Sequence, residues 1–330
     1  MIPILLGAGA VAAAGAAAGQ LATRRVRDRY PAPGRLVDIG GYRLHLECEG
    51  EGQPAVVLES GVGDIGITWA GVLPEIAGFT RVCAYDRAGL GWSDASRRPR
   101  TAAVMVEELR ALLSGAGVAP PYVLVAQSFG ALPATLLAST HRDVVAGMVL
   151  VDPAHPDQIE RAPQAVRDAY RRMARMIGPM FTLPRALAAS GVYALRPGMV
   201  PMMGGGPIPE AVGEERYRAL LARGAGGFRT LTAEMEHLEE SRAQVRAAMG
   251  PLGDLPLVVL SAGEEAPLPV PEEARQANAV VWRELHRELA ALSSRGRVEV
   301  VDGSGHMIHH ERPEVVVGAI REVVEAARGG

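Results

Sequence analysis

The segment Ala126–Gly130, with the sequence AQSFG, lies between an apolar run over Tyr122–Ala126 and a helical stretch over Ala131–Ala138. This order of strand, sharp turn and helix is typical of a nucleophile elbow, in which small residues flank a serine on a strained turn. The turn lifts the Ser128 hydroxyl clear of the sheet edge, and the following helix directs its amide donors toward any oxyanion formed there. A serine in this setting can also be a simple helix N-cap. The assignment of Ser128 as a nucleophile therefore depends on a base and an acid elsewhere in the chain.

Short apolar runs alternate with longer segments of helical spacing on both sides of this turn. This alternation predicts a mainly parallel sheet with helices on both faces and ligands at the carboxyl ends of the strands. The expected strands cover Arg35–Ile39, Tyr42–Cys48, Ala55–Glu59, Thr80–Tyr85, Tyr122–Ala126, Val144–Val151, Leu255–Leu260 and Arg297–Val301. The expected helices cover Thr68–Ile76, Ala102–Leu113, Ala131–Ala138, Pro271–Leu292 and Glu314–Ala327.

Residues 153–250 break this alternation, because they form helical pieces interrupted by glycine and proline. We expect a helical lid inserted after the sixth strand, so that the predicted domains are an N-terminal segment over 1–29, a core over 30–152 and 251–330, and the lid. The lid holds eight of the chain's 12 methionines, including Met173, Met176, Met180, Met199, Met202 and Met203. Methionine is flexible and polarizable, so these side chains either line a pocket for an apolar substrate or pack the lid onto the core.

The N-terminal segment differs from the rest of the chain in composition. Residues 1–23 contain no charged side chain and are dominated by Ala and Gly, and four arginines follow within 24–29. At about 1.5 Å per residue, such a run can cross a hydrocarbon core of ~30 Å. A signal peptide begins with basic residues, and none precedes this run. The arginines that follow it would then place the folded domain in the cytoplasm by the positive-inside rule. We expect a membrane anchor here, with a cleaved segment and secretion as the alternative.

Composition and motifs exclude several classes of function. The formal net charge of −3 and the lack of a basic stripe argue against a nucleic-acid partner. No zinc-type Cys/His spacing, P-loop or GxGxxG motif is present, so neither a metal nor an organic cofactor is expected. The two cysteines, Cys48 and Cys83, fall in two predicted strands. They are either small buried residues or, if those strands are neighbours, a disulfide.

A serine hydroxyl becomes a good nucleophile only when a base takes its proton and a carboxylate orients that base. His306 is the candidate base, because it follows the last predicted strand on a Gly-bracketed loop at the same sheet edge as Ser128. His309 and His310 lie one turn further along and are expected to face solvent or to pack locally. The order serine, acid, histidine would apply if the acid lies between Ser128 and His306.

Taken together, these features resemble the α/β-hydrolase fold with a lid, over roughly residues 35–327. The resemblance rests on Ser60-Gly61, on the segment Tyr85–Ser93 with the sequence YDRAGLGWS, on the elbow, and on 305–314 with the sequence GHMIHHERPE. It implies a doubly wound, mainly parallel eight-stranded sheet with the lid after strand six. The chain departs from the family where Ala126 replaces the usual Gly of the elbow and where Ser60-Gly61 replaces a frequent His-Gly.

The resemblance also implies an oxyanion site and a triad acid. The oxyanion donors are backbone amides, which we assign to Val62 and Phe129. Most relatives carry the acid after strand seven, where this chain has Glu264 and Glu265 and no Asp. Asp152 instead ends strand six, and the similar haloalkane dehalogenase subgroup keeps its acid at that place. We therefore assign Asp152 and keep Glu265 or Glu264 as the alternative.

Epoxide hydrolases and haloalkane dehalogenases of this fold attack with Asp, whereas position 128 is Ser. The resemblance therefore implies a serine hydrolase that cleaves carboxylic esters of an apolar small molecule through an acyl-enzyme, without a cofactor. One alternative is an amidase or aminopeptidase of the proline iminopeptidase-like type, in which an acidic lid residue binds the amino terminus. The candidates for that residue are Glu234, Glu236, Glu239 and Glu240. A hydrolase-fold binding protein without turnover is the other alternative.

Overall fold

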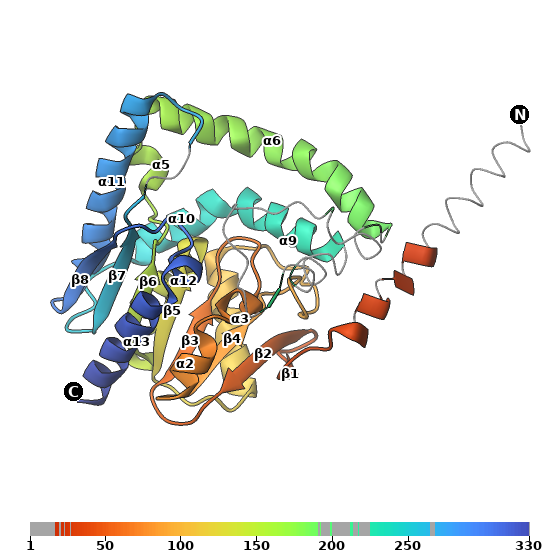
Figure 1. The fold of residues 1–330 in the computed structure, drawn as a ribbon, viewed down its shortest axis with the longest axis horizontal. Coiled ribbons are helices and arrows are strands. Elements are labelled where there is room, and N and C mark those ends of the chain that lie inside the picture. The colour runs from red at the N-terminus through yellow and green to blue at the C-terminus, as the bar shows by residue number, and fades with distance from the viewer. Residues whose placement is uncertain are drawn as a thin grey trace, which may run out of the picture.

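A single eight-stranded sheet forms the centre of the molecule in a computed structural model (Figure 1). The structure describes residues 17–19, 21–22, 24–26, 28–190, 192, 199, 212–213, 217, 225–264 and 268–329. The strands are β1 (Arg35–Asp38), β2 (Arg43–Glu49), β3 (Ala55–Glu59), β4 (Val82–Tyr85), β5 (Tyr122–Gln127), β6 (Val145–Val151), β7 (Leu257–Ala262) and β8 (Gly296–Val301). Their order is β1-β2-β4-β3-β5-β6-β7-β8, with β2 antiparallel to both neighbours and all pairs from β4 to β8 parallel. The predicted mainly parallel, doubly wound sheet is confirmed.

Helices cover both faces of the sheet, which is why its central strands are apolar along their whole length. One hydrophobic cluster joins the sheet to α3 (Ala102–Gly115), α4 (Ala131–Thr140) and the end of α11 (Glu272–Ala290). The opposite face packs against α2 (Leu73–Ala77) and α13 (Pro313–Arg328). The two clusters hold the sheet edge with the carboxyl ends of β3 to β8 in a fixed position.

The helix expected over 68–76 is shorter in the structure and begins later. A 3-10 turn, η1 (Gly66–Trp69), comes first, and α2 begins only at Leu73. Pro74 explains the break, because proline lacks an amide hydrogen and fits only the first turn of a helix.

The chain leaves the sheet after β6 and forms a helical insertion, as predicted. Its described helices are α5 (Gln158–Arg161), α6 (Gln164–Ala189), α9 (Ala225–Glu236) and α10 (Leu238–Ala248). In Figure 1 the long α6 crosses above the sheet, and it packs along α9 through a small apolar cluster. By contrast, α10 packs against α3 and α4, and its Val245 belongs to the main core. The boundary proposed at residue 250 stays a prediction.

Cys48 and Cys83 form a disulfide between β2 and β4. The two residues are direct partners in the antiparallel register of these strands, with their Cα atoms 4.1 Å apart. The sequence left open whether the two cysteines are unpaired buried residues or a disulfide, and the structure contains the disulfide.

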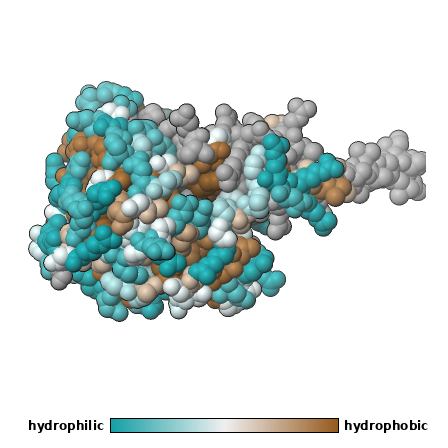
Figure 2. Space-filling model, turned by 60° about the horizontal axis from the view of Figure 1, so that its bottom comes forward, coloured by the Kyte–Doolittle hydropathy of each residue, from teal (hydrophilic) through white to brown (hydrophobic). Residues whose placement is uncertain are grey.

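The predicted N-terminal membrane anchor requires a correction. Among the described residues, no helix combines the length and the apolar character needed to cross a membrane. Most of the segment that suggested the anchor, residues 1–16, lies outside the described residues. On the face shown in Figure 2, hydrophilic residues predominate and hydrophobic ones form separate patches.

Candidate functional site

Ser128 occupies a strained turn directly after β5. Its φ is +51°, in the left-handed region that residues with a Cβ rarely adopt. The turn packs so closely on the end of β3 that a Cβ at Gly130 would lie 2.7 Å from the carbonyl oxygen of Ser60. Only glycine fits at position 130, and this requirement explains the small residue two positions after the serine. The turn leads through η2 (Ser128–Gly130) into α4, as the elbow pattern predicts.

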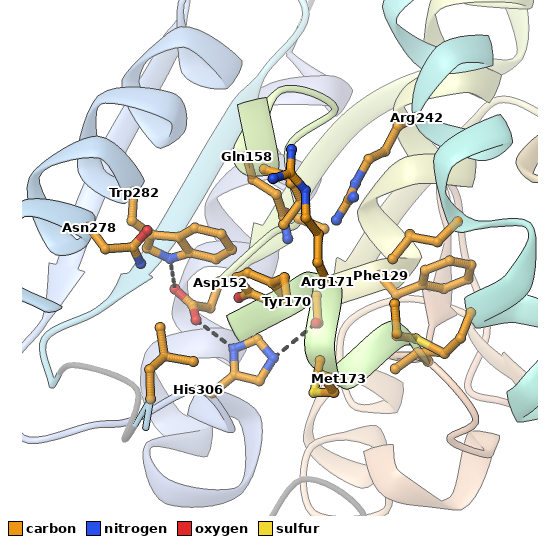
Figure 3. Close-up of a pocket in the computed structure, with 18 of the residues that line it drawn as sticks. Phe129, Asp152, Gln158, Tyr170, Arg171, Met173, Arg242, Asn278, Trp282 and His306 are labelled. Carbon is orange, nitrogen blue, oxygen red and sulfur yellow. Dashed lines mark hydrogen bonds and ion pairs between the residues drawn. The ribbon is translucent and has the colours of Figure 1, made fainter. Parts of the chain in front are cut away.

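His306 lies on the loop between β8 and α12 (Ile308–Glu311) and faces Ser128. Its Nε2 is 2.9 Å from Ser128 Oγ, and its Nδ1 is 2.6 Å from Asp152 Oδ2. Figure 3 shows the hydrogen bond between Asp152 and His306 and a second hydrogen bond on the other side of the imidazole ring. Loops that follow three different parallel strands supply these residues, and parallel strands bring their carboxyl ends to the same edge.

Asp152 is held from both sides of its carboxylate. Its φ is +42°, so it too lies in the left-handed region at the end of its strand. Oδ1 accepts hydrogen bonds from the Ala262 amide at 3.1 Å and from Trp282 Nε1 at 3.1 Å, which leaves Oδ2 for His306. Burial alone would raise the pKa of Asp152, but the hydrogen bond and charge of His306 outweigh it and lower that pKa. The carboxylate is therefore ionised at neutral pH and can orient the imidazole.

The alternative acids do not take this place in the part of the chain that the structure describes. Glu264 lines the same cavity, and its described hydrogen bond is from its backbone amide to the Ser304 carbonyl. Glu265 lies outside the described residues. The geometry thus brings Asp152 to His306, while the catalytic roles of all three residues stay predictions.

The two amides proposed as oxyanion donors lie beside the serine. Val62 and Phe129 line one cavity together with Ser128 and His306. Phe129 is in the first turn after the elbow, where backbone N–H groups have no partner within their own helix. Val62 follows Gly61 on the loop after β3. A Cβ at Gly61 would lie 2.4 Å from Gln127 Oε1. A larger residue at position 61 would require the Gln127 side chain to move.

A buried arginine holds the Val62 loop in place. Arg87, on the loop after β4, donates to the carbonyl oxygens of Ser60 at 2.7 Å and Gly61 at 2.6 Å. The same guanidinium forms ion pairs with Glu59 at 2.6 Å and with Glu234 of α9 at 2.7 Å. It also lies 5.4 Å from the centre of the Phe129 ring. One side chain thus connects the loop that carries Val62, the ring of Phe129 and the helical insertion.

Glu234 completes this network from the insertion. Its second oxygen accepts a hydrogen bond from the Gly63 amide at 2.7 Å, and the side chain is fully buried. Glu234 is therefore engaged inside the protein and is not available to bind a substrate amino group. Of the other acidic candidates, Glu236 and Glu239 line the cavity.

The cavity has a volume of about 840 Å³ and lies between the sheet edge and the insertion. Of the methionines named from the sequence, Met173 lines it, Met176, Met180 and Met199 are exposed, and Met202 and Met203 lie outside the described residues. Several polar lining residues were not foreseen, namely Gln158, Tyr170, Arg242, Asn278 and Trp282. They lie on helices without a local motif, and no signal in the sequence would have found them.

His309, which the sequence left as exposed or locally packed, lies inside the protein. His309 is buried, packs its ring 4.5 Å from that of Trp69 and bonds Thr68, so the expectation of local packing fits better than exposure. Among the described residues, no group of three potential metal ligands is present.

Comparison with known proteins identifies relatives of the whole core. Residues 56–319 match the alpha/beta hydrolase family. The protein YqjL of Bacillus subtilis (strain 168), described as uncharacterized, is 29% identical over 292 residues, which cover 88% of this chain and 91% of YqjL.

Solved structures resemble the chain in fold. The epoxide hydrolase CorEH has a TM-score of 0.63 and 19% identity, with 88% of this chain and 97% of that chain covered. An esterase from Thermogutta terrifontis, with malate bound, has a TM-score of 0.58 and 22% identity, with 87% and 94% covered. At these identities the likeness extends to the fold alone.

Replacement of Arg87 by Met should lower the free energy of unfolding by about 3–5 kcal/mol, because it leaves the buried carboxylates of Glu59 and Glu234 without their positively charged partner. Urea unfolding measures the change. Arg98 forms an exposed pair with Glu107, so Arg98→Met should cost no more than about 1 kcal/mol. Equal losses in the two variants would contradict the importance of the buried network.

Stability should fall as the pH is lowered from about 6.5 toward 4. Burial lowers the pKa of His155 to about 4, and its Nδ1 accepts a hydrogen bond from the Asp157 amide that protonation would remove. The stabilisation is complete above the unfolded pKa of about 6.5 and is lost as the pH falls, by about 2–3 kcal/mol at pH 4.5. Urea unfolding of His155→Asn, in which an amide oxygen can still accept, should show a smaller pH dependence. Parallel curves for the two proteins would contradict this assignment.

Proposed function

This chain belongs to the α/β-hydrolase family, and we propose that it is a serine hydrolase that cleaves carboxylic esters through an acyl-enzyme intermediate. The observation that carries the proposal is the chain of hydrogen bonds from Ser128 through His306 to Asp152 at the wall of a large cavity. The three residues have the types, order and distances that nucleophilic acyl transfer requires.

The geometry supports a two-step reaction. Ser128 Oγ attacks the ester carbonyl while His306 Nε2 takes its proton, and Asp152 holds the Nδ1–H of the ring and stabilises the imidazolium that forms. The amides of Val62 and Phe129 donate to the tetrahedral oxyanion, each such donor lowering the barrier by about 3–4 kcal/mol. His306 then gives the proton to the leaving alkoxide. A water molecule, activated by the same ring, releases the acid and restores Ser128.

Ester substrates fit the site better than amine-containing ones. The cavity offers apolar walls, including Val62, Ile177 and Leu238, for the body of a small molecule. Of the four acidic residues considered for binding a peptide amino terminus, Glu234 is bonded to Arg87 and Gly63 instead. Epoxide hydrolysis on this fold uses Asp as the nucleophile, and position 128 is Ser. The aligned serine and histidine also count against a binding protein without turnover.

Turnover of a nitrophenyl ester panel tests this function, with Asp152→Asn as the diagnostic variant. The amide should donate to His306 and favour the wrong tautomer, so kcat should fall by about 10⁴. Glu264→Gln removes an acid from the same cavity that makes no described hydrogen bond with His306, and it should change kcat by less than about tenfold.

Ser128→Ala should abolish turnover in the same assay. A severe loss in Glu264→Gln with a mild one in Asp152→Asn would reassign the acid. A folded wild-type protein that hydrolyses no ester of the panel would contradict ester hydrolysis as the function.

A further inference from the structure

Three arginines are buried in the described part of the molecule, and one of them is poorly paired. Arg87 is bonded to two buried carboxylates, and Arg100 forms two hydrogen bonds of 2.8 Å with the buried Glu108. Arg242, only 5% exposed, has a single described contact, at 3.5 Å with Glu239. That glutamate is 64% exposed, so most of its charge is screened by water.

The guanidinium of Arg242 has unused hydrogen-bonding capacity. Its Nε is buried and has no hydrogen-bond partner. Burial lowers the pKa of Arg242 even though Glu239 and Glu160 act in the opposite direction. Glu160 is itself bonded to Arg246 at 2.9 Å. A buried cation without a full partner costs stability, and an anion that arrives from outside the chain would supply the missing partner.

Arg242 faces the same cavity as the triad. It projects from α10, and in Figure 3 it points into the space between Gln158 and Phe129, across the cavity from His306. Tyr170 of α6 lies between Arg242 and the triad. Burial raises the pKa of the Tyr170 hydroxyl, the charge of Arg242 lowers it and the charge of Asp152 raises it, so both groups are close. Tyr170 and Gln158 line the cavity and carry further donors, so the anion would meet several hydrogen-bonding groups at once.

We propose that Arg242 binds a carboxylate carried by the substrate, so that the enzyme acts on esters of small molecules with an apolar body and a free carboxylate. The proposal rests on the esterase function proposed above. A guanidinium presents a planar fork of donors that matches a carboxylate, and charge-assisted hydrogen bonds of this kind are strong inside a protein. The apolar residues that line the same cavity would hold the connecting chain.

Paired substrates that differ only in this charge test the proposal. The first pair is the mono-4-nitrophenyl ester of suberic acid and its methyl-capped form, which place the charge on the acyl side. The second pair is 4-acetoxybenzoate and its methyl ester, which place it on the alcohol side. In the wild type, kcat/KM for the charged member of at least one pair should exceed that of the neutral member by about tenfold or more.

Arg242→Met should remove this preference, and the charged-to-neutral ratio should approach one. Arg283 is an arginine of the same cavity that is exposed to solvent, and Arg283→Met should leave the ratio within about twofold of the wild type. The ratio cancels any general effect of a variant on the catalytic machinery. No preference in either pair for the wild type, or the same loss in both variants, would overturn the proposal and leave ester hydrolysis standing.

Binding decides the question without turnover. Calorimetry on Ser128→Ala should detect monomethyl suberate but not dimethyl suberate, and Ser128→Ala/Arg242→Met should bind neither. Absence of binding of both monomethyl suberate and 4-acetoxybenzoate to Ser128→Ala would count against the carboxylate site even if no ester is ever hydrolysed. A structural role for Arg242 would predict a lower melting temperature for Arg242→Met, whereas removal of an unpaired buried charge should leave it equal or raise it.

Discussion

The site depends on one buried guanidinium, that of Arg87. Three segments far apart in the sequence meet at it: the loop after β3, the loop after β4 and helix α9 of the insertion. The attraction of Glu234 and Glu59 more than offsets the effect of burial and raises the pKa of Arg87, so the charge is permanent. Because the loop carbonyls and the carboxylates share its five donors, none of these segments can move without breaking a buried charged contact.

Two further constraints complete the site from the sheet. Ser128 and Asp152 both have positive φ at the carboxyl ends of neighbouring strands, and Asp152 is fixed by β7 and by Trp282 of α11. Strained backbone of this kind persists only where the surrounding structure over-determines it. The packed sheet and the close contacts at Gly130 provide that support. The hydroxyl and the carboxylate are therefore placed directly at the ends of β5 and β6, and the imidazole on the loop after β8 is held by its hydrogen bonds to both.

Local patterns predicted the parts of this arrangement that a short segment can encode. Ser128 could be predicted from the strand, the turn and the helix around it, and His306 from its position after the last strand. The choice between Asp152 and the glutamates after β7 needed family resemblance, because it depends on which loop folds toward the histidine. The disulfide depended on strand order, since only the pairing of β2 with β4 brings Cys48 opposite Cys83.

Other features could not be read from the sequence for physical reasons. Glu234 and Arg242 both look like members of charged helix faces, and only the packing of α9 and α10 buries them. The membrane anchor was predicted because the uncharged run at the N-terminus is long enough to cross a bilayer. The described residues contain no helix that could span a membrane, so this prediction is corrected. Whether a polar side chain is buried depends on which elements pack against it, and this packing cannot be read from a single sequence.

Covalent labelling with a fluorophosphonate is the most direct test of the central claim that Ser128 is an activated nucleophile. Mass spectrometry of the full chain should show one adduct, and peptide mapping should place it on Ser128. The Ser128→Ala variant should remain unlabelled while retaining the wild-type unfolding curve. An unlabelled wild-type protein that is folded, or an adduct that persists in Ser128→Ala, would contradict the assignment of the site.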